Sequence, residues 1–242
     1  MVKVKNGKTG RIEFSGTDAA EVIQSAIDAL PVEGGKILIK AGKYVLTASI
    51  DLTGKYYVTL EGEGRGRALD YAGGNWVEEG ATILKLADGV DDHLIKMVET
   101  SPAKITGVTI RDLHLHGNGA NQTSGSASDI IHLEYVKQVL IENCVIRQAR
   151  RHGISLTGAC ENIWIVNNVI RQGGNSEGEC IYLSTAVGNE ILFNTILGAS
   201  GGRGIRLESQ CHYNTIIGNG ITDNDVGVRI VASNYNRVIG NM

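Results

Sequence analysis

Several features that mark other protein classes are scarce or missing in this sequence. Its 242 residues include only two prolines and 5% aromatic residues, while 42% are hydrophobic, which excludes a disordered or collagen-like chain. The opening MVKVKNGKTG is polar, and no apolar run approaches the roughly 18 residues of a membrane span, so neither a secretory signal nor a membrane segment is visible. We therefore expect no membrane partner.

The chain also lacks an excess of positive charge. Its 23 Lys and Arg residues stand against 26 Asp and Glu residues, and the net charge of -3 gives no general attraction to the phosphates of nucleic acid. We expect no nucleic-acid partner. The sequence fits a cytosolic protein, a phage structural part or an excised piece of a secreted protein, and we favour an extracellular or virion-associated parent.

Cysteine is scarce and has no CxxC pairing. Four residues are too few for a disulfide scaffold in a chain of this length. Buried free thiols are favoured over disulfides or metal ligands. The four residues are Cys144, Cys160, Cys180 and Cys211.

Glycine, in contrast, is abundant, and it accompanies an internal repeat. The runs IENCVI, IVNNVI, ILFNTI and IIGNGI, with a partial VIGNM at the end, align in one column with steps of 24, 26, 25 and 22 residues. A second column runs through IIHL, GISL, CIYL, GIRL and GVRI. Each repeat therefore holds two short strand-like runs separated by Gly, Asn and Ser. The first column contains Cys144, Asn168, Asn194, Asn219 and Asn241, and the second contains Ile131, Ile154, Ile181, Ile205 and Val228.

Strands that recur in the same order about every 24 residues, with no helical crossover, predict an all-β fold, a right-handed parallel β-helix. Its coils are expected over residues 36–242. The Asn column is interpreted as a hydrogen-bonded ladder at a bend of the coil, in preference to a catalytic role.

The N-terminal part predicts one helix. Asp18 and Glu21 form a capping box, and apolar residues follow at helical spacing, so residues 18–30 are expected to form an amphipathic helix that covers the open end of the β-helix. We expect a single domain over residues 1–242. Asn241 and Met242 end the chain without a polar cap, which predicts that further protein or another chain covers this end.

Two irregular segments are expected to be loops that project from the coils, at 61–81 and 117–128. GEGRG at 62–66 is interpreted as a turn in preference to a dinucleotide loop, because no helix pattern follows it. His114 and His116 could share a metal with Asp112, but exposed strand residues are favoured, so no metal site is expected.

The N-terminal runs GTDAAEVIQSAIDAL, GGKILIKAGKYVL and VTLEGEG resemble the opening of pectate-lyase-superfamily β-helix domains, which include phage tailspikes and polyuronate epimerases. ATILKLADGV and ITGVTIRDLHLHGNGANQTSG are similar to the catalytic module of mannuronan C5-epimerases. The DPHE motif of those epimerases is absent, and HGISLTG at 152–158 stands in the corresponding stretch. The resemblance implies a β-helix that acts on an acidic polysaccharide.

Polygalacturonases of the same superfamily carry NTD, DD, GHG and RIK in that order. This chain offers Asp129, then His152 with Gly153, then RGIR at 203–206. It has no double aspartate, and Glu179 follows the histidine instead of preceding it. The hydrolase roles therefore transfer only in part.

The second column also predicts a strip of reactive side chains on the outer face of the coils, because alternate strand residues point away from the core. Stacking at about 4.8 Å per coil would place Asp129 and Glu179 about 9 to 10 Å apart, with His152 between them. That separation is at the edge of the roughly 6.5 to 9.5 Å found in inverting glycosidases. The catalytic candidates are Asp129, His152 and Glu179, and the substrate-binding candidates are His132, Tyr182, Arg203, Arg206 and Arg229.

Arginines in this strip could bind a uronate carboxylate and thereby acidify the proton on the neighbouring carbon for a base. The alternative is that stacked Arg and Glu residues on a solvent face form ordinary surface ion pairs. Three functions remain open: a carbohydrate-active enzyme on an acidic polysaccharide, a non-catalytic glycan-binding module, and a structural scaffold or spike segment, with a homotrimer as one form of it. No cofactor is expected, with bound Ca²⁺ left open.

Overall fold

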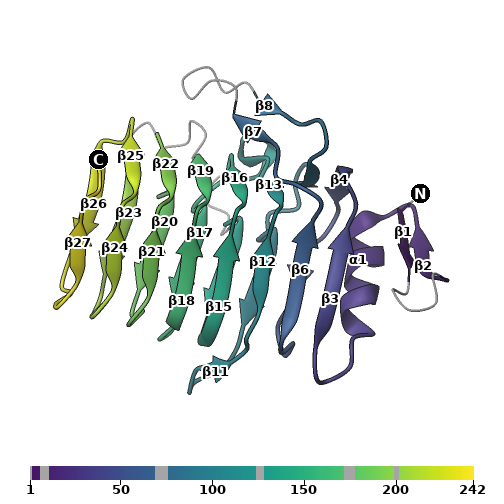
Figure 1. Cartoon of the computed structure of the whole chain (residues 1–242), viewed down its shortest axis with the longest axis horizontal. Coiled ribbons are helices and arrows are strands. Elements are labelled where there is room, and N and C mark those ends of the chain that lie inside the picture. The colour runs from purple at the N-terminus through teal and green to yellow at the C-terminus, as the bar shows by residue number, and fades with distance from the viewer. Residues whose placement is uncertain (1, 6–10, 69–75, 124–127, 172–177, 199–201) are drawn as a thin grey trace.

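Strands dominate the computed structural model, which describes residues 2–5, 11–68, 76–123, 128–171, 178–198 and 202–242. The chain winds as a right-handed parallel β-helix, and successive coils follow one another along the long axis of the molecule (Figure 1). Each full coil contributes one strand to each of three parallel sheets, here called sheets I, II and III. The predicted fold class is confirmed.

Sheet I is the longest of the three. It contains β3 (Gly35–Ile39), β6 (Val58–Gly62), β12 (Thr109–Arg111), β15 (Val136–Glu142), β18 (Glu161–Val166), β21 (Glu190–Leu192), β24 (Thr215–Ile217) and β27 (Arg237–Ile239), with β11 (Lys104–Ile105) paired beside β15.

Sheets II and III complete each coil in turn. Sheet II contains β4 (Gly42–Leu46), β9 (Thr82–Leu86), β13 (His114–His116), β16 (Val145–Arg147), β19 (Val169–Arg171), β22 (Thr195–Leu197) and β25 (Gly220–Thr222). Sheet III contains β5 (Ile50–Asp51), β10 (Ile95–Val98), β14 (Ile131–Glu134), β17 (Ile154–Thr157), β20 (Ile181–Ser184), β23 (Arg203–Glu208) and β26 (Val226–Ile230).

The expectation of two strands per repeat was wrong, because each full coil has three. The run IENCVI contains the end of β15, a bend and the start of β16. Asn143 adopts a left-handed backbone conformation at this bend, with φ of 50°. A single residue of that kind turns the chain from sheet I into sheet II without interrupting the apolar pattern, so the sequence shows one run where the structure has two strands.

The predicted register of the apolar column is confirmed in sheet III. Ile131, Ile154, Ile181, Ile205 and Val228 pair with one another in consecutive coils. The four isoleucines are fully buried and belong to one continuous core that extends through the stack. All four cysteines are buried free thiols, as expected.

The Asn ladder is also confirmed. The Oδ1 atom of Asn194 accepts hydrogen bonds from the backbone N–H and the side-chain Nδ2 of Asn168, at 2.9 and 3.1 Å. Asn219 receives the same pair of bonds from Asn194. A second ladder, absent from the sequence analysis, joins Asn189, Asn214 and Asn236 where the chain enters sheet I.

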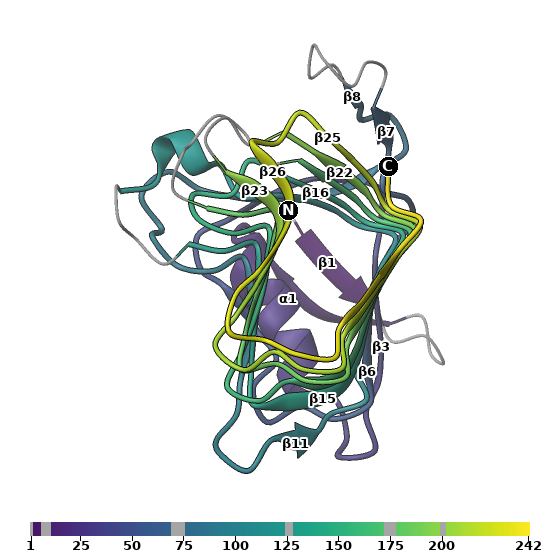
Figure 2. The ribbon, with the colours of Figure 1, turned by 90° about the vertical axis from the view of Figure 1, so that its left-hand side faces the viewer.

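Helix α1 (Ala19–Asp28) covers the N-terminal end of the stack (Figure 2). Its N-cap is Asp18, whose side chain accepts hydrogen bonds from the backbone N–H groups of Ala20 and Glu21. Beyond it, β1 (Val2–Lys5) and β2 (Ile12–Gly16) form an antiparallel pair. No helix in the described part of the chain is long and apolar enough to cross a bilayer.

The expected loop at 61–81 leaves sheet I after β6 and contains the antiparallel pair β7 (Arg67–Ala68) and β8 (Trp76–Val77), while 69–75 lie outside the described residues. Nearby, His114 and His116 are buried, at 0% and 8% exposure, so the expectation of exposed strand residues was wrong. Arg147 donates to Nε2 of His114 at 2.6 Å and also contacts Glu78 at 2.7 Å. The contact between Glu78 and Arg147 could not be read from the local strand pattern.

Candidate functional site

The candidate residues gather where the chain passes from sheet II into sheet III. The sheet II strands β13, β16, β19 and β22 are followed in the chain by the sheet III strands β14, β17, β20 and β23, and Figure 2 shows the short 3-10 helix η1 (Gly119–Asn121) at the corner between the two sheets. Asp129, His152 and Glu179 each lie two residues before the inward isoleucine of their coil, as predicted. The fold therefore stacks them along one edge of sheet III.

This edge is not the solvent face that the sequence suggested. Asp129 is fully buried, and His132, His152 and Glu179 are at most 9% exposed. Residues of neighbouring coils contact the side chains at the start of each strand, so period-two alternation does not determine their exposure. The carboxylates lie below the surface, and their partners determine what a ligand can reach.

Asp129 is held by four hydrogen-bond donors. Arg151 forms a bidentate pair, with Nε to Oδ1 and Nη2 to Oδ2 both at 2.8 Å. The backbone N–H of His152 donates to Oδ1 at 3.0 Å, and Oγ of Ser155 donates to Oδ2 at 2.6 Å. Burial alone would raise the pKa of Asp129, but the hydrogen bond from Arg151, with those from its neighbours, outweighs burial and holds this pKa well below its usual range.

Glu179 occupies the same place two coils further on, with His152 in the coil between. Its Oε2 lies 3.0 Å from Nδ1 of His152, and its Oε1 accepts hydrogen bonds from Arg203 at 2.8 Å and Arg206 at 3.3 Å. Burial would raise the pKa of this carboxyl, but His152 and the two guanidinium groups lower it to about 2. Glu179 therefore carries its negative charge at neutral pH.

Aromatic and ionic contacts continue the site along sheet III. The ring of Tyr182 stacks on that of His152, with centroids 4.5 Å apart and planes within 9°. The guanidinium carbon of Arg206 lies over the ring of Tyr182, 5.8 Å from the ring centroid. Arg206 also forms an ion pair with Glu208. The Tyr182 hydroxyl donates to Glu208, and burial with this hydrogen bond raises the pKa of Tyr182 to about 12.

Arg229 extends the row by one coil, because β26 pairs with β23 in a register that places Arg229 beside Arg206. It is exposed, in contrast to the buried residues of the earlier coils. The structure thus joins Asp129 with His132 in one cluster and Glu179 with His152, Tyr182, Arg203 and Arg206 in a second, and it leaves Arg229 at the C-terminal edge.

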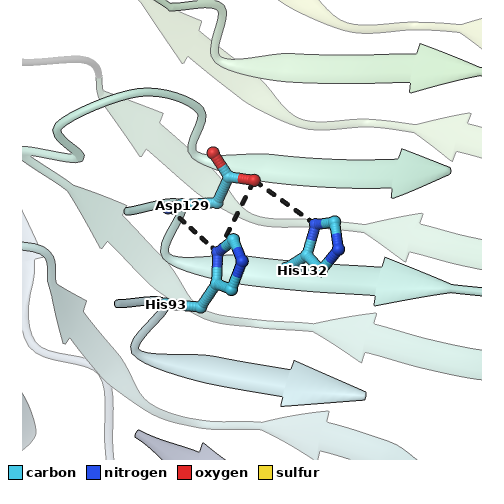
Figure 3. Close-up of side chains that lie close together, drawn as sticks. All are labelled: His93, Asp129 and His132. Carbon is cyan, nitrogen blue, oxygen red and sulfur yellow. Dashed lines mark hydrogen bonds and ion pairs between the residues drawn. The ribbon is translucent and has the colours of Figure 1, made fainter. Parts of the chain in front are cut away.

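The sequence analysis missed His93, which lies at the N-terminal side of the first cluster (Figure 3). Its ring stacks on His132 with centroids 4.3 Å apart and planes within 7°. Its Nδ1 accepts a hydrogen bond from the backbone N–H of Asp129 at 3.2 Å. Burial lowers the pKa of His93 to about 4. His93 lies two residues before Ile95, which pairs with Ile131, so extending the aligned column by one coil would have found it.

Within the described residues, one group of side chains has the spacing of a metal site. Its members each offer a nitrogen or oxygen atom that could bind a metal ion, and these atoms all lie within 4.8 Å of one another: His93, Asp129 and His132. The same residues make the contacts drawn in Figure 3: Nδ1 of His132 lies 3.4 Å and Nδ1 of His93 3.7 Å from Oδ2 of Asp129.

Solved structures with the same fold include carbohydrate-active proteins. A proposed glycosyl hydrolase from Parabacteroides merdae is 17% identical over 90% of this chain and 89% of its own, with a TM-score of 0.54. The A-module of a mannuronan C-5 epimerase from Azotobacter vinelandii is 18% identical over 93% and 73%, with a TM-score of 0.51. An endo-xylogalacturonan hydrolase from Aspergillus tubingensis is 13% identical over 98% and 73%, also with a TM-score of 0.51.

At these identities the likeness shows the fold alone. None of the curated proteins compared with the chain matches it in sequence. A family model, however, matches residues 56–242, which is most of the coiled region. By this match the chain belongs to the family described as periplasmic copper-binding protein (NosD).

Proposed function

We propose that this chain binds an acidic polysaccharide over sheet III where the guanidinium groups of Arg203, Arg206 and Arg229 reach the surface. The proposal rests on a difference in burial between the negative and the positive side chains. The Glu179 side chain is 5% exposed, whereas those of Arg203 and Arg206 are 28% and 27% exposed. A ligand approaching this surface therefore meets guanidinium groups, and the buried carboxylate below holds them in place.

The shape of the guanidinium group also suits the ligand. A uronate carboxylate offers two acceptor oxygens in one plane, which match two parallel N–H donors of an arginine. The Nε atoms of Arg203 and Arg206 are buried, so an acidic sugar would bind through the exposed part of each side chain.

Bond-breaking chemistry at this site would rest on His152. If Nδ1 carries the ring proton and donates a hydrogen bond to Oε2 of Glu179, the lone pair of Nε2 is left to accept a proton from a sugar. With the uronate carboxylate neutralised by arginine, the proton on the adjacent carbon could pass to Nε2. Addition of a proton from solvent to the opposite face of that carbon would give epimerisation, and His152 would release its extra proton to solvent. Loss of the neighbouring glycosidic oxygen, which takes a proton from solvent, would give elimination.

Hydrolysis by two carboxyl groups is less well supported. An inverting mechanism needs one carboxylic acid that is protonated before the reaction. The pKa of Glu179 is about 2, and that of Asp129 is also lowered, so both are ionised near neutral pH. Neither is therefore suited to act as the general acid, and the network favours proton abstraction over hydrolysis.

The alternative function is a structural scaffold or spike segment, including a trimeric one. Two Asn ladders and the ion pairs around Glu179 support it, since both rigidify the stack without any ligand. The family's description places its members in the periplasm, and either function would suit a protein that works outside the cytoplasm.

Copper is implied by the family's description, and the donor cluster of His93, Asp129 and His132 is where the described residues would have to hold it. Imidazole and carboxylate are suitable ligands for Cu²⁺. The arrangement, however, does not fit. Asp129 is already saturated by hydrogen bonds, and the two rings are stacked with parallel planes. Lone pairs in parallel ring planes do not converge on one ion.

The proposal is tested with a panel of polyuronates and neutral glycans. Binding is measured by calorimetry, elimination by ultraviolet absorbance of unsaturated uronate, and hydrolysis by reducing ends. We expect Arg206→Ala to weaken binding of an acidic oligosaccharide by about 1.5 to 3 kcal/mol, roughly 10- to 150-fold. Arg237→Ala, which removes an exposed arginine from sheet I, should leave binding unchanged.

Glu179→Gln or His152→Ala should lower turnover more than affinity, if turnover is found. Added salt should weaken the part of the affinity that depends on arginine. Absence of both binding and turnover across the panel would overturn the proposal and leave the scaffold function.

A further inference from the structure

Arg151 occupies the position that a metal ion would need beside Asp129. A carboxylate offers about four lone-pair sites on its two oxygens. Here Oδ1 accepts from Nε of Arg151 and from the backbone N–H of His152, and Oδ2 accepts from Nη2 of Arg151 and from Oγ of Ser155. All the sites are filled, and two of the four donors belong to one guanidinium group.

The histidine nitrogens nearest Asp129 are also engaged. Nδ1 of His93 accepts the backbone N–H of Asp129, and Nδ1 of His132 lies 2.7 Å from Oγ of Ser155. Coordination of one ion by both histidines and Asp129 would break these hydrogen bonds and unstack the rings. The cluster therefore has the residue types of a metal site, but its carboxylate is bonded to a guanidinium cation instead of a metal ion.

The backbone of Arg151 is fixed by the coils on either side. Its N–H donates to the carbonyl of Ser128 in the preceding coil, at 3.3 Å. Its carbonyl oxygen lies so close to Gly178 in the following coil that a Cβ atom there would be 1.6 Å away. Because the backbone is held on both sides, the guanidinium group is directed onto Asp129 by the stack itself.

From this arrangement we infer that the Arg151 guanidinium is the built-in cation of the His93–Asp129–His132 cluster and excludes copper from it, so that this member of the family does not hold the metal there. The inference is independent of the proposed polysaccharide binding. It rests on Asp129 and its donors, whereas the polysaccharide proposal rests on Glu179 and the arginines after it.

The test is titration of the purified full chain with Cu²⁺, followed by calorimetry and by electron paramagnetic resonance. For the unaltered chain we expect no stoichiometric Cu²⁺ site that depends on His93 or His132. Arg151→Ala frees two acceptor sites of Asp129 and removes a positive charge, and the strong binding of Cu²⁺ to imidazole then offsets the loss of the ring stacking and of the hydrogen bonds to Nδ1. We therefore expect this variant to gain one Cu²⁺ per chain, bound at least about tenfold more tightly than by the unaltered chain. The resonance spectrum should then show nitrogen coupling.

Controls separate the cluster from incidental surface binding. Adding His93→Ala to Arg151→Ala should remove the gained site, whereas adding His212→Ala, which lies in a distant coil, should not. Arg151→Lys keeps the charge and should continue to exclude the ion. Should Arg151→Ala fail to fold, Arg151→Gln retains one hydrogen bond to Asp129 without the charge and serves the same purpose.

Two results would overturn the inference. One is a stoichiometric Cu²⁺ site in the unaltered chain that is lost with His93→Ala or His132→Ala. The other is a folded Arg151→Ala or Arg151→Gln protein, verified by circular dichroism, that gains no Cu²⁺ and no increase in Tm on adding it. Failure of polysaccharide binding would affect neither result.

Discussion

Nδ1 of His152 lies 3.0 Å from Oε2 of Glu179 and 3.1 Å from the backbone nitrogen of the same residue. The two contacts suit different tautomers of the imidazole ring. With the proton on Nε2, Nδ1 accepts the backbone N–H of Glu179, and with the proton on Nδ1, it donates a hydrogen bond to the carboxylate. Glu179 can therefore hold the ring in place in both tautomers, and only the second leaves Nε2 with a lone pair that can accept a proton.

Glu179 should make stability depend on pH in the acid range. Its folded-state pKa of about 2 lies below the ordinary value of 4.5. A lowered pKa contributes stability that is present above about pH 4.5 and is lost as the pH falls toward 2. The difference corresponds to on the order of 3 kcal/mol. Urea unfolding of the unaltered chain and of Glu179→Gln between pH 7 and pH 3 should show a shallower pH dependence for the variant, and parallel curves would contradict the assignment.

Gly178 should be required for the contact between adjacent coils at the site. A Cβ atom there would lie 1.6 Å from the carbonyl oxygen of Arg151, so Gly178→Ala must displace one of the two coils. We expect the free energy of unfolding to fall by about 1 to 3 kcal/mol, as for other overpacked sites. Gly220→Ala, where a Cβ atom would meet nothing within 4 Å, is the matched control and should have little effect in the same urea unfolding.

The inward asparagines should contribute more than their size suggests. Asn194→Ala leaves the backbone N–H of Asn168 and the carbonyl of Ile165 without the partners they have now. Each buried group left unsatisfied costs about 1 to 3 kcal/mol. Thr195→Ala, on the neighbouring outward position, should cost far less. Similar losses for the two variants in thermal unfolding would mean that the ladder is not a stabilising element.

The isoleucine column should show the same contrast between the inside and the outside of a coil. Ile181→Ala and Ile205→Ala each remove a fully buried side chain and should cost about 2 to 5 kcal/mol through lost burial and a residual cavity. Thr157→Ala points outward from sheet III and should cost little. Equal losses in denaturant unfolding would be inconsistent with the register observed here, because a shift of one residue exchanges the two faces.

The sequence by itself determined the coil and much of its register. Isoleucine and asparagine recur once per turn because every coil must fill the same position in the core and the same bend, so spacing alone identifies them. The helix that begins after Asp18 was equally visible, since capping and helical periodicity are local properties. The third strand of each coil was hidden, because a left-handed residue such as Asn143 turns the chain without breaking the apolar pattern.

Only the tertiary structure decided what the polar residues do. The sequence placed Asp129, His152 and Glu179 in one column, but it gave no sign that they would be buried or that Arg151 would pair with Asp129. Pairing of stacked arginine and glutamate was expected only on a solvent face, whereas Arg203 pairs with a buried Glu179. Those partners come from other coils, more than twenty residues apart in the chain. Burial and pairing of these residues depend on contacts between coils. The charge state of the two carboxyl groups follows from both, so these properties arise only when the coils are stacked.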